Sequence, residues 1–339
     1  MQEILARNKI FAHPDRLEER IKTWSTKPIT IEMDLTNRCN YNCPSCAWNR
    51  FYWNAELSLD NIINIIDQLK KFVRWIIFSW WWDPLMNKNI IKAIIYANSL
   101  WIDIWLITNW WLLHKYNMKD LVTYTKWIRV SINWVNDDDF TKKNWFWKEG
   151  YNQVRNNVTN LAKEKRKRNS DSIIGIGYLT EDNENYGNIK NFCEKAKNTW
   201  VDYIQFRPYH HTKTNIIKKL EKCREKIKDK YFDVLYTSEK YERRMFDYEI
   251  AFADEFRAVI AADWNMYPDC FTRWIKEFCF GNILRNTFDE IWNSNKRKNI
   301  IKNKIKQKNC PWQCRQEPLN QILWDIYKIN KEWKHINFI

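Results

Sequence analysis

Three cysteines near the start of the sequence have the spacing of a metal or cluster site. Cys39, Cys43 and Cys46 occur in the segment TNRCNYNCPSC, directly after a strand-like apolar run. Three thiolates in one short loop can point at one centre, and soft sulfur ligands select zinc or an iron-sulfur cluster. A structural zinc site would need a fourth ligand close by, whereas a cubane held by three thiolates keeps one iron open. The spacing therefore favours an iron-sulfur cluster with an open iron, and zinc is the alternative.

The other cysteines divide into a second candidate site and two core residues. Four thiolates near the C-terminus could complete a [4Fe-4S] cluster without an open iron, although zinc also accepts an all-thiolate shell. These four are Cys270, Cys279, Cys310 and Cys314. Cys193 and Cys223 share helical spacing with apolar residues, and we expect both in the core.

Tryptophan is abnormally frequent in this sequence, and glycine is abnormally rare. The chain has 22 Trp and 5 Gly, whereas average usage predicts about 24 Gly. Many Trp occupy turn sites, where glycine supplies positive φ or close backbone approach: 80–82 before Asp83-Pro84, 110–111 after Asn109, and Trp134. We infer that UGA codons meaning glycine in the source were read as tryptophan. The Trp that lie inside strand or helix patterns, and that we expect to be genuine, are Trp127, Trp292 and Trp324.

Three more segments contain glycine at their turn positions when these Trp are replaced by Gly. FSWWWDPL (78–85) becomes FSGGGDPL, ITNWW (107–111) becomes ITNGG, and IRVSINW (128–134) becomes IRVSING. Each segment lies at the end of a predicted strand, and their order follows the chain. Together with LTNRCN and the CxxxCxxC spacing, they resemble the radical S-adenosylmethionine (radical SAM) superfamily over roughly residues 29–210.

The resemblance implies a cofactor and a set of binding residues. A [4Fe-4S] cluster on Cys39, Cys43 and Cys46 would bind S-adenosylmethionine through its open iron. The residues that the resemblance places against this cofactor are Trp81, Trp82, Asp83, Thr108, Asn109, Ser131 and Asn133. Two positions depart from the family pattern. Ser45 stands where an aromatic residue usually lies beside the adenine, so Tyr41 or a residue beyond Cys46 would take that role, and Asp83 replaces the commoner Glu.

The C-terminal region resembles the SPASM and Twitch extensions of radical SAM enzymes. It contains an apparent hairpin ending in Tyr-Pro-x-Cys, a Gly-Asn-Ile segment, a helix with Ile-Trp, and a closing cysteine pair. A full SPASM domain has about seven cysteines for two clusters. The four cysteines present here therefore imply one auxiliary [4Fe-4S] cluster, with a zinc site as the alternative.

Strand and helix patterns alternate through the first two thirds of the chain, which is typical of βαβ units. The predicted strands are residues 29–35, 73–79, 104–108, 127–132, 173–179 and 203–206. Helices are predicted after the N-cap Ser58, up to Leu69, and over 87–99, 151–165 and 186–198. Because crossovers are right-handed, six such units curl into an open barrel or a wound sheet, and the loops at the strand C-termini form one functional face.

The pattern changes after Arg207-Pro208, where a charged helix (213–230) and a strand-like run (232–236) follow. We predict an α/β fold, a partial (β/α)6 TIM-like barrel with a small C-terminal α+β cluster-binding extension. The expected parts are an N-terminal extension (1–28), the radical SAM core (29–210), a connecting helix region (211–235) and the SPASM/Twitch-like domain (236–339). Arg207, at the end of the sixth strand, is a candidate substrate contact through an anionic group. We expect His210 and His211 in a solvated loop.

Composition narrows the function classes. The net charge of +15 is spread over several runs in a sequence rich in Lys, Asn and Ile, so it does not favour a nucleic-acid partner. No window approaches 18 consecutive apolar residues, and the start MQEILARNKI has charges where a signal peptide would need an apolar stretch. We therefore expect a cytoplasmic protein without a membrane partner, with its cysteines reduced.

The resemblance implies an enzyme of oxidoreductase or transferase type. It would cleave S-adenosylmethionine reductively and abstract hydrogen from a peptide or small-molecule metabolite, with electrons from a low-potential donor such as a flavodoxin or ferredoxin. Two alternatives stay open: a radical SAM enzyme that modifies RNA, and a non-enzymatic zinc or iron-sulfur protein.

Overall fold

The computed structural model describes residues 7–44, 46, 54–79, 82–133, 136–144, 150–181, 184–209, 216–241, 248–306 and 316–332. The chain forms two compact units. The first comprises Met1–Leu5, Asp34–Ile62 and Ile77–Arg244, and the second comprises Ala6–Met33, Ile63–Ile76 and Met245–Ile339. Helix α2 (Leu59–Leu69) and strand β2 (Trp75–Phe78) cross from one unit to the other. The domain boundaries expected from the sequence stay a prediction.

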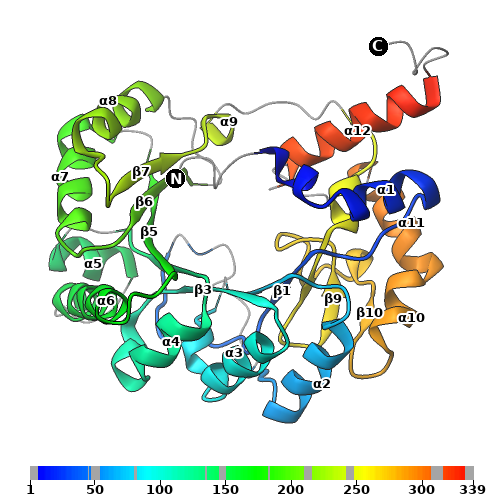
Figure 1. Ribbon diagram of the computed structural model, residues 1–339, viewed down its shortest axis with the longest axis horizontal. Helices are drawn as coiled ribbons and strands as arrows, with labels where there is room; N and C mark the ends of the chain where they lie inside the picture. Colours follow the sequence, from blue (N-terminus) through cyan, green and yellow to red (C-terminus); the bar gives the residue numbers. More distant parts are fainter. Residues whose placement is uncertain are drawn as a thin grey trace. The chain divides into compact units, whose positions relative to one another are not determined.

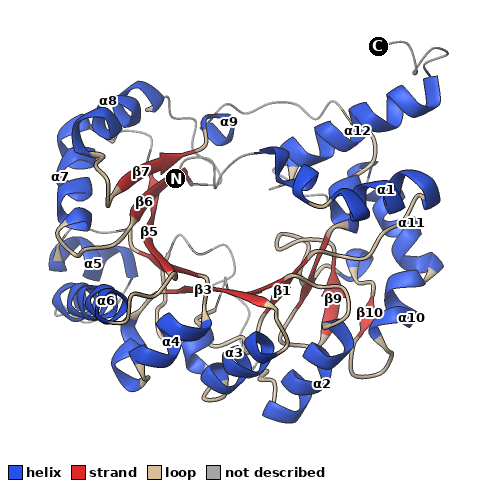
Figure 2. Cartoon of the chain, in the orientation of Figure 1, coloured by secondary structure: helices blue, strands red, loops and turns tan. Residues whose placement is uncertain are grey.

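Five parallel strands form the sheet of the first unit, in the order β3-β4-β5-β6-β7. Their bounds are β3 Asp103–Thr108, β4 Trp127–Ser131, β5 Ile173–Thr180, β6 Tyr203–Pro208 and β7 Asp233–Tyr236. The strands predicted from residue 104 to residue 206 are thus confirmed, and β7 extends the row. The connecting helices lie outside the curved sheet (Figures 1 and 2). They are η3 Pro84–Met86, α3 Ile90–Ser99, η4 Trp111–Lys115, α4 Met118–Tyr124, α5 Asp137–Asn144, α6 Gly150–Lys167, α7 Tyr186–Lys197, α8 Ile217–Ile227 and α9 Ser238–Tyr241.

The two faces of this sheet differ in chemistry, because successive side chains of a strand point to opposite sides. One set of alternate positions is apolar and buried along most of each strand, with the polar Thr108 and Thr180 at the ends of β3 and β5: Ile104, Leu106, Ile128, Val130, Ile174, Ile176, Ile204 and Phe206. The other set carries aromatic residues at the start of the strands and polar residues towards their C-terminal ends. A layer of helices needs an apolar surface to pack on, so the helices cover the apolar face. The second face therefore lines the barrel.

The aromatic end of the barrel-lining face is closed by Trp127, Tyr203 and Leu235. The Trp127 indole Nε1 donates a hydrogen bond of 2.6 Å to the Tyr203 hydroxyl. A Cβ atom at Gly175 would lie 2.0 Å from the Tyr203 ring, so the glycine on β5 leaves room for this ring. These contacts agree with the prediction that Trp127 is a genuine tryptophan.

The second unit has a smaller sheet. Strand β1 (Thr30–Met33) pairs in parallel with β8 (Arg257–Ile260), and β8, β9 (Asn265–Tyr267) and β10 (Gly281–Asn282) form an antiparallel meander. The expected C-terminal hairpin is therefore present, and it is joined to β1 rather than separate from the N-terminal part of the chain. The helices of this unit are η2 Arg7–Ala12, α1 Pro14–Thr23, η5 Phe252–Glu255, η6 Lys276–Phe278, α10 Phe288–Asn293, α11 Asn295–Asn303, η7 Lys304–Lys306 and α12 Glu317–Glu332.

The other two tryptophans expected to be genuine also fit their surroundings. Trp292 is fully buried, and its Nε1 donates a hydrogen bond of 2.8 Å to the Thr26 carbonyl oxygen. Trp324 is buried and stacks on Tyr327, with ring centroids 5.2 Å apart. Both residues have the apolar contacts, and Trp292 also has the acceptor, that a buried indole needs.

Backbone geometry separates these tryptophans from many others. Seven non-glycine residues in the described part of the chain have positive φ, and six of them are Trp: Trp24, Trp101, Trp110, Trp200, Trp264 and Trp274. The seventh is Asn169, a residue type that tolerates this conformation. Left-handed backbone favours glycine, because a Cβ crowds the following carbonyl. The six positions thus have the geometry of glycine sites, which favours the UGA interpretation.

Trp101 shows the point most clearly, because it closes helix α3. Its N–H donates to the Asn98 carbonyl at 3.0 Å, and the Ile102 N–H donates to the Ala97 carbonyl at 3.2 Å. This pair of bonds is the Schellman motif, whose left-handed residue is usually glycine. Trp101 has φ 62°, and its side chain is 94% exposed. Packing gives no reason for an indole at this position.

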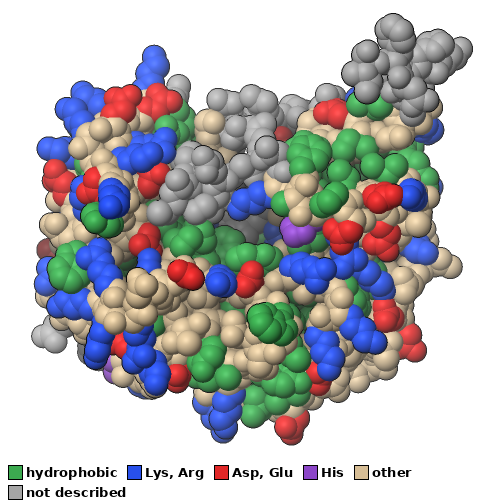
Figure 3. All heavy atoms as spheres, viewed as in Figure 1, with side chains coloured by type: hydrophobic (Ala, Val, Ile, Leu, Met, Phe, Trp, Pro, Cys, Tyr) green, Lys and Arg blue, Asp and Glu red, His purple; other side chains and the backbone are tan. Residues whose placement is uncertain are grey.

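Two further features concern membrane-spanning helices and the surface charge. No helix within the described ranges is long and apolar enough to cross a bilayer. On the face shown in Figure 3, Lys and Arg side chains alternate with Asp and Glu. The excess positive charge on that face is therefore dispersed, as expected for a solvated basic surface.

Candidate functional site

The loop that carries Cys39, Cys43 and Cys46 is closed at its base by backbone hydrogen bonds. The Leu57 N–H donates to the Leu35 carbonyl at 2.9 Å, and the Asn37 N–H donates to the Ala55 carbonyl at 3.0 Å. The Asn37 side chain accepts from the Ala55 N–H at 2.8 Å. Within the loop, the Cys46 N–H donates to the Cys43 carbonyl at 3.0 Å, which makes a tight turn between the second and third cysteines.

The thiols of this loop fit a cationic centre. Burial raises the pKa of Cys39, and the charges of Asp83, Cys43 and Cys46 raise it further. Burial and the neighbouring Cys46 raise the pKa of Cys43 to about 12. Since ligation requires thiolates, a positive metal centre would have to offset this unfavourable negative charge. No three His, Cys, Asp or Glu side chains among the described residues converge on a point that would suit a single metal ion. Thiolates are the usual ligands of iron-sulfur clusters, so the donor chemistry of this loop fits a cluster.

Two N–H groups approach the Cys39 sulfur. The Tyr41 backbone N–H donates at 3.4 Å, and Asn109 Nδ2 donates at 3.6 Å. Asn109 Nδ2 also donates to Asn40 Oδ1 at 2.8 Å. Hydrogen bonds to thiolate sulfur tune iron-sulfur clusters, so Asn109 connects the end of β3 to the first cysteine. A role for Asn40 was not predicted from the sequence, although its position directly after Cys39 could have indicated one.

Asp83 joins three of the predicted cofactor residues. Its Oδ2 accepts from Thr108 Oγ1 at 2.7 Å and from the Asn109 N–H at 2.7 Å, while its Oδ1 accepts from the Leu85 N–H at 2.8 Å. Burial raises the pKa of Asp83 to about 6, although these hydrogen bonds oppose the shift. Asp83 thus holds the ends of β2 and β3 together and orients Asn109 towards the cysteine loop.

Two tryptophans that adjoin Asp83 and Asn109 in the sequence have buried indole N–H groups. Trp110 has φ 73° and is fully buried, and its indole Nε1 has no hydrogen-bond partner. The Trp82 indole N–H is likewise buried without a partner. An unpaired buried N–H costs about 1–3 kcal/mol, whereas the indoles of Trp127 and Trp292 have acceptors. Trp81, also assigned to the cofactor, lies outside the described residues.

The two predicted residues of the fourth strand lie at its C-terminal end. Ser131 is the last residue of β4 and pairs with Gly177 of β5. Asn133 Oδ1 accepts from the Leu179 N–H at 3.0 Å, which fixes the loop after β4 against β5. Ser131 therefore stands on the barrel-lining face, while Asn133 has a structural contact as well as its predicted cofactor role.

A pair of arginines converges on the same face. A Cβ at Gly177 would lie 3.1 Å from Arg129 Cδ and 3.3 Å from Arg207 Nη2, so the two guanidinium side chains approach each other over this glycine. Arg129 Nη1 also donates to Gln205 Oε1 at 3.2 Å. The sequence suggested Arg207 alone. Arg129 and Gln205 become visible only when strand register places β4 and β6 on either side of β5.

In the second unit, the described auxiliary cysteines share one end of a hairpin. Cys270 is fully buried and follows β9, while Cys279 comes just before β10. Met266 of β9 pairs with Gly281 of β10, and the Phe280 N–H donates to the Met266 carbonyl at 2.8 Å. This register brings the two cysteine-bearing segments to the same end. Cys310 and Cys314 lie outside the described residues, as do His210 and His211.

The other sequence-assigned cysteines are core residues, as expected. Cys193 on α7 and Cys223 on α8 are fully buried, with their Sγ atoms 3.2 Å apart. They lie between two packed helices rather than on the barrel-lining face.

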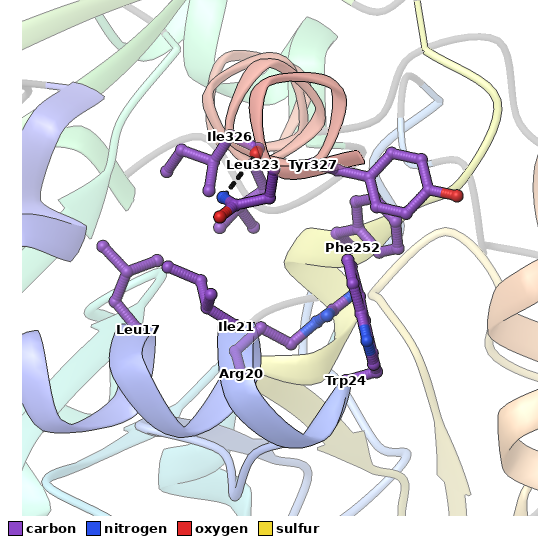
Figure 4. Close-up of a pocket in the computed structure, with 9 residues that line it drawn as sticks. Leu17, Arg20, Ile21, Trp24, Phe252, Leu323, Ile326 and Tyr327 are labelled. Carbon is purple, nitrogen blue, oxygen red and sulfur yellow. Dashed lines mark hydrogen bonds between the residues drawn. The ribbon is translucent and has the colours of Figure 1, made fainter. Parts of the chain in front are cut away.

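Two hollows are lined by described residues. A cavity of about 20 Å³ lies between α1 and α12, with Leu17, Arg20 and Trp24 on one wall and Leu323 and Tyr327 on another (Figure 4). This volume is close to that of one water-sized sphere. A wider groove of about 500 Å³ beside the cysteine loop is open to solvent and is lined by Arg38, Glu56, Leu57, Ser58, Leu59, Met86, Lys88 and Asn89.

Comparison with known families and structures agrees with this geometry. The radical SAM superfamily model matches residues 33–186, and the SPASM iron-sulfur cluster-binding domain model matches residues 252–316. No curated protein matches the chain in sequence.

Solved structures show the same fold. SuiB of Streptococcus suis, bound to S-adenosylmethionine, aligns with TM-score 0.65 and 13% identity, covering 91% of this chain and 75% of SuiB. Native anSMEcpe with bound AdoMet aligns with TM-score 0.57 and 13% identity, covering 92% of this chain and 100% of that protein. These likenesses confirm the α/β fold, the TIM-like partial barrel and the C-terminal extension.

The family assignment also identifies the cofactors. A radical SAM domain uses a [4Fe-4S] cluster and S-adenosylmethionine, and a SPASM domain binds auxiliary iron-sulfur clusters. The cysteine loop after β1, the buried Asp83 and the cysteine hairpin all lie within the matched ranges. This chain is a radical SAM enzyme with a C-terminal SPASM domain.

Proposed function

We propose that this enzyme abstracts a hydrogen atom from a peptide that binds against the barrel-lining face of β4, β5 and β6. The observation that carries this proposal is the convergence of Arg129 and Arg207 over Gly177, with Gln205 hydrogen-bonded to Arg129. Guanidinium groups bind carboxylates with paired hydrogen bonds, and an amide such as Gln205 can bind a peptide group. Peptides offer both kinds of group.

The cofactor would lie next to this substrate region. Cys39, Cys43 and Cys46 would hold the cluster, and Asn109 and Ser131 would face S-adenosylmethionine, together with Asn133 and the segment 81–83. When bound, the cluster and S-adenosylmethionine supply reductive cleavage to a 5′-deoxyadenosyl radical. The protein's part is to orient the substrate and to exclude water, for which Trp127 and Tyr203 close the start of the barrel.

Named relatives support a peptide over a free metabolite. SuiB has been solved bound to its precursor peptide SuiA, with TM-score 0.65 to this chain, and anSMEcpe with the peptide Cp18Cys, with TM-score 0.55. Both proteins share the fold of this chain. The electron would come from a low-potential donor such as a flavodoxin or ferredoxin.

The auxiliary site belongs to the same proposal. Cys270, Cys279, Cys310 and Cys314 would hold one auxiliary [4Fe-4S] cluster. Such a cluster could accept an electron from the substrate radical or bind the substrate directly. Zinc at this site is an alternative that metal analysis distinguishes.

Deuterium transfer tests the substrate class. The anaerobically reconstituted, reduced enzyme is given S-adenosylmethionine and one of three deuterium-labelled fractions from its source cells: peptides, small metabolites or RNA. The 5′-deoxyadenosine product is then weighed by mass spectrometry. The variant with Cys39, Cys43 and Cys46 replaced by Ala controls for enzyme-independent product.

Deuterium in 5′-deoxyadenosine from the peptide fraction is the expected result. Incorporation from the metabolite or RNA fraction alone would contradict the peptide assignment while leaving hydrogen abstraction intact. Product that never acquires deuterium from any fraction would contradict both.

A further inference from the structure

A buried lysine in the second unit is paired with the carboxylate that directly precedes Cys270, a proposed auxiliary ligand. Lys304 begins η7, directly after α11, and is 1% exposed. Its Nζ donates to Asp254 Oδ2 at 2.6 Å and also to Asp269 Oδ2. Burying an ammonium group costs several kcal/mol unless carboxylates of good geometry compensate it. Lys304 is therefore held firmly at this place.

Asp269 shapes the turn that carries Cys270. Its Oδ1 accepts from the Phe271 N–H at 2.7 Å, its own N–H donates to Thr272 Oγ1 at 3.2 Å, and its carbonyl accepts from that hydroxyl at 2.9 Å. Cys270 is therefore enclosed by a turn whose organising carboxylate is also the partner of Lys304. Asp254, the second partner, lies in η5, away from both cysteine segments in the sequence.

We propose that the Lys304–Asp269 ion pair positions Cys270 for the auxiliary cluster, because it fixes the carboxylate that organises the turn carrying this cysteine. The inference rests on the proposed auxiliary cluster of the preceding section. Lys304 and Asp269 act through Cys270 and do not themselves bind iron.

Asp254 provides a matched control for the test. Asp254→Asn and Asp269→Asn make the same chemical change to two fully buried partners of the same lysine, and each leaves Lys304 one carboxylate. Only Asp269 belongs to the Cys270 turn. If the triad merely stabilises the fold, the two variants should behave alike.

The experiment measures iron and sulfide on the full chain after anaerobic reconstitution, together with the electron paramagnetic resonance signals of the reduced clusters. The wild type should hold about eight irons, and Cys270→Ala about four. We expect D269N to lose most of the auxiliary iron and signal, D254N to keep both, and the signal of the Cys39, Cys43 and Cys46 cluster to persist in each. That persisting signal reports a folded first unit.

Two outcomes would overturn the proposal: full auxiliary iron in D269N, or equal losses in the two variants. A wild type with about four irons, unchanged in Cys270→Ala, is a different failure. It would remove the auxiliary cluster assignment itself.

Discussion

Replacement of Trp101 by glycine should stabilise the protein, although most substitutions destabilise. Trp101 is the left-handed residue that ends α3, with φ 62° and a side chain 94% exposed. The left-handed conformation costs an L-residue about 1–2 kcal/mol, which glycine removes. Glycine also increases the entropy of the unfolded chain, which costs about 0.4–1 kcal/mol. Since almost no apolar burial is lost, we expect a net gain of about 1 kcal/mol in the free energy of unfolding.

Trp101→Ala is the matched control, because it removes the indole and keeps the Cβ that causes the strain. We expect it to leave stability almost unchanged. Trp292→Gly provides the opposite case. Trp292 is fully buried and donates to the Thr26 carbonyl, so its loss should cost about 3–5 kcal/mol.

Urea unfolding of the three apo variants and the parent, followed by far-ultraviolet circular dichroism, gives these differences. Stability of Trp101→Gly equal to or below that of Trp101→Ala would refute the strain argument. A loss in Trp101→Gly as large as that in Trp292→Gly would show that the exposed indole belongs to the native protein.

Three further results are expected. Replacing Cys39, Cys43 and Cys46 together by Ala should remove about four irons and leave the auxiliary cluster; iron analysis that shows the full wild-type content would contradict the ligand assignment. Arg207→Gln should reduce peptide-dependent deuterium transfer about 10- to 100-fold, the value of one or two charged hydrogen bonds, while substrate-free cleavage of S-adenosylmethionine continues; an equal fall in both rates would place Arg207 in the cofactor site instead. Trp110→Gly, alone or with Gly at positions 80–82, 111 and 134, should strengthen binding of S-adenosylmethionine in calorimetry, because a fully buried indole with an unpaired N–H then leaves the site; unchanged affinity would count against the glycine interpretation.

Local patterns were enough for much of the fold and for the first ligand set. Cys39, Cys43 and Cys46 are close together in the chain, so their spacing alone indicates a common centre. The strands between residues 104 and 206 show as apolar runs because their helix-facing side chains must be buried. The excess of Trp at turn sites similarly pointed to glycine before any dihedral angle was known, since turns have their own residue preferences.

Other parts of the site depend on tertiary structure. Arg129 and Arg207 are separated in sequence by α5, α6, β5 and α7, and only the register of β4, β5 and β6 brings them together over Gly177. Asp83 accepts hydrogen bonds from Thr108 and Asn109, which belong to the next strand and its loop. Lys304 finds Asp254 and Asp269 inside the second unit, although its sequence neighbours are those of an ordinary charged helix.

The physical reason is the range of each interaction. Ligand spacing in one loop, helix periodicity and turn preference act over a few residues, so the sequence itself determined the cluster loop, the alternating elements and the glycine-like positions. Buried ion pairs and contacts across strands depend on which distant segments share a low-dielectric interior. Strand register and chain packing alone decided these contacts, and with them the paired arginines of the barrel and the Lys304 anchor.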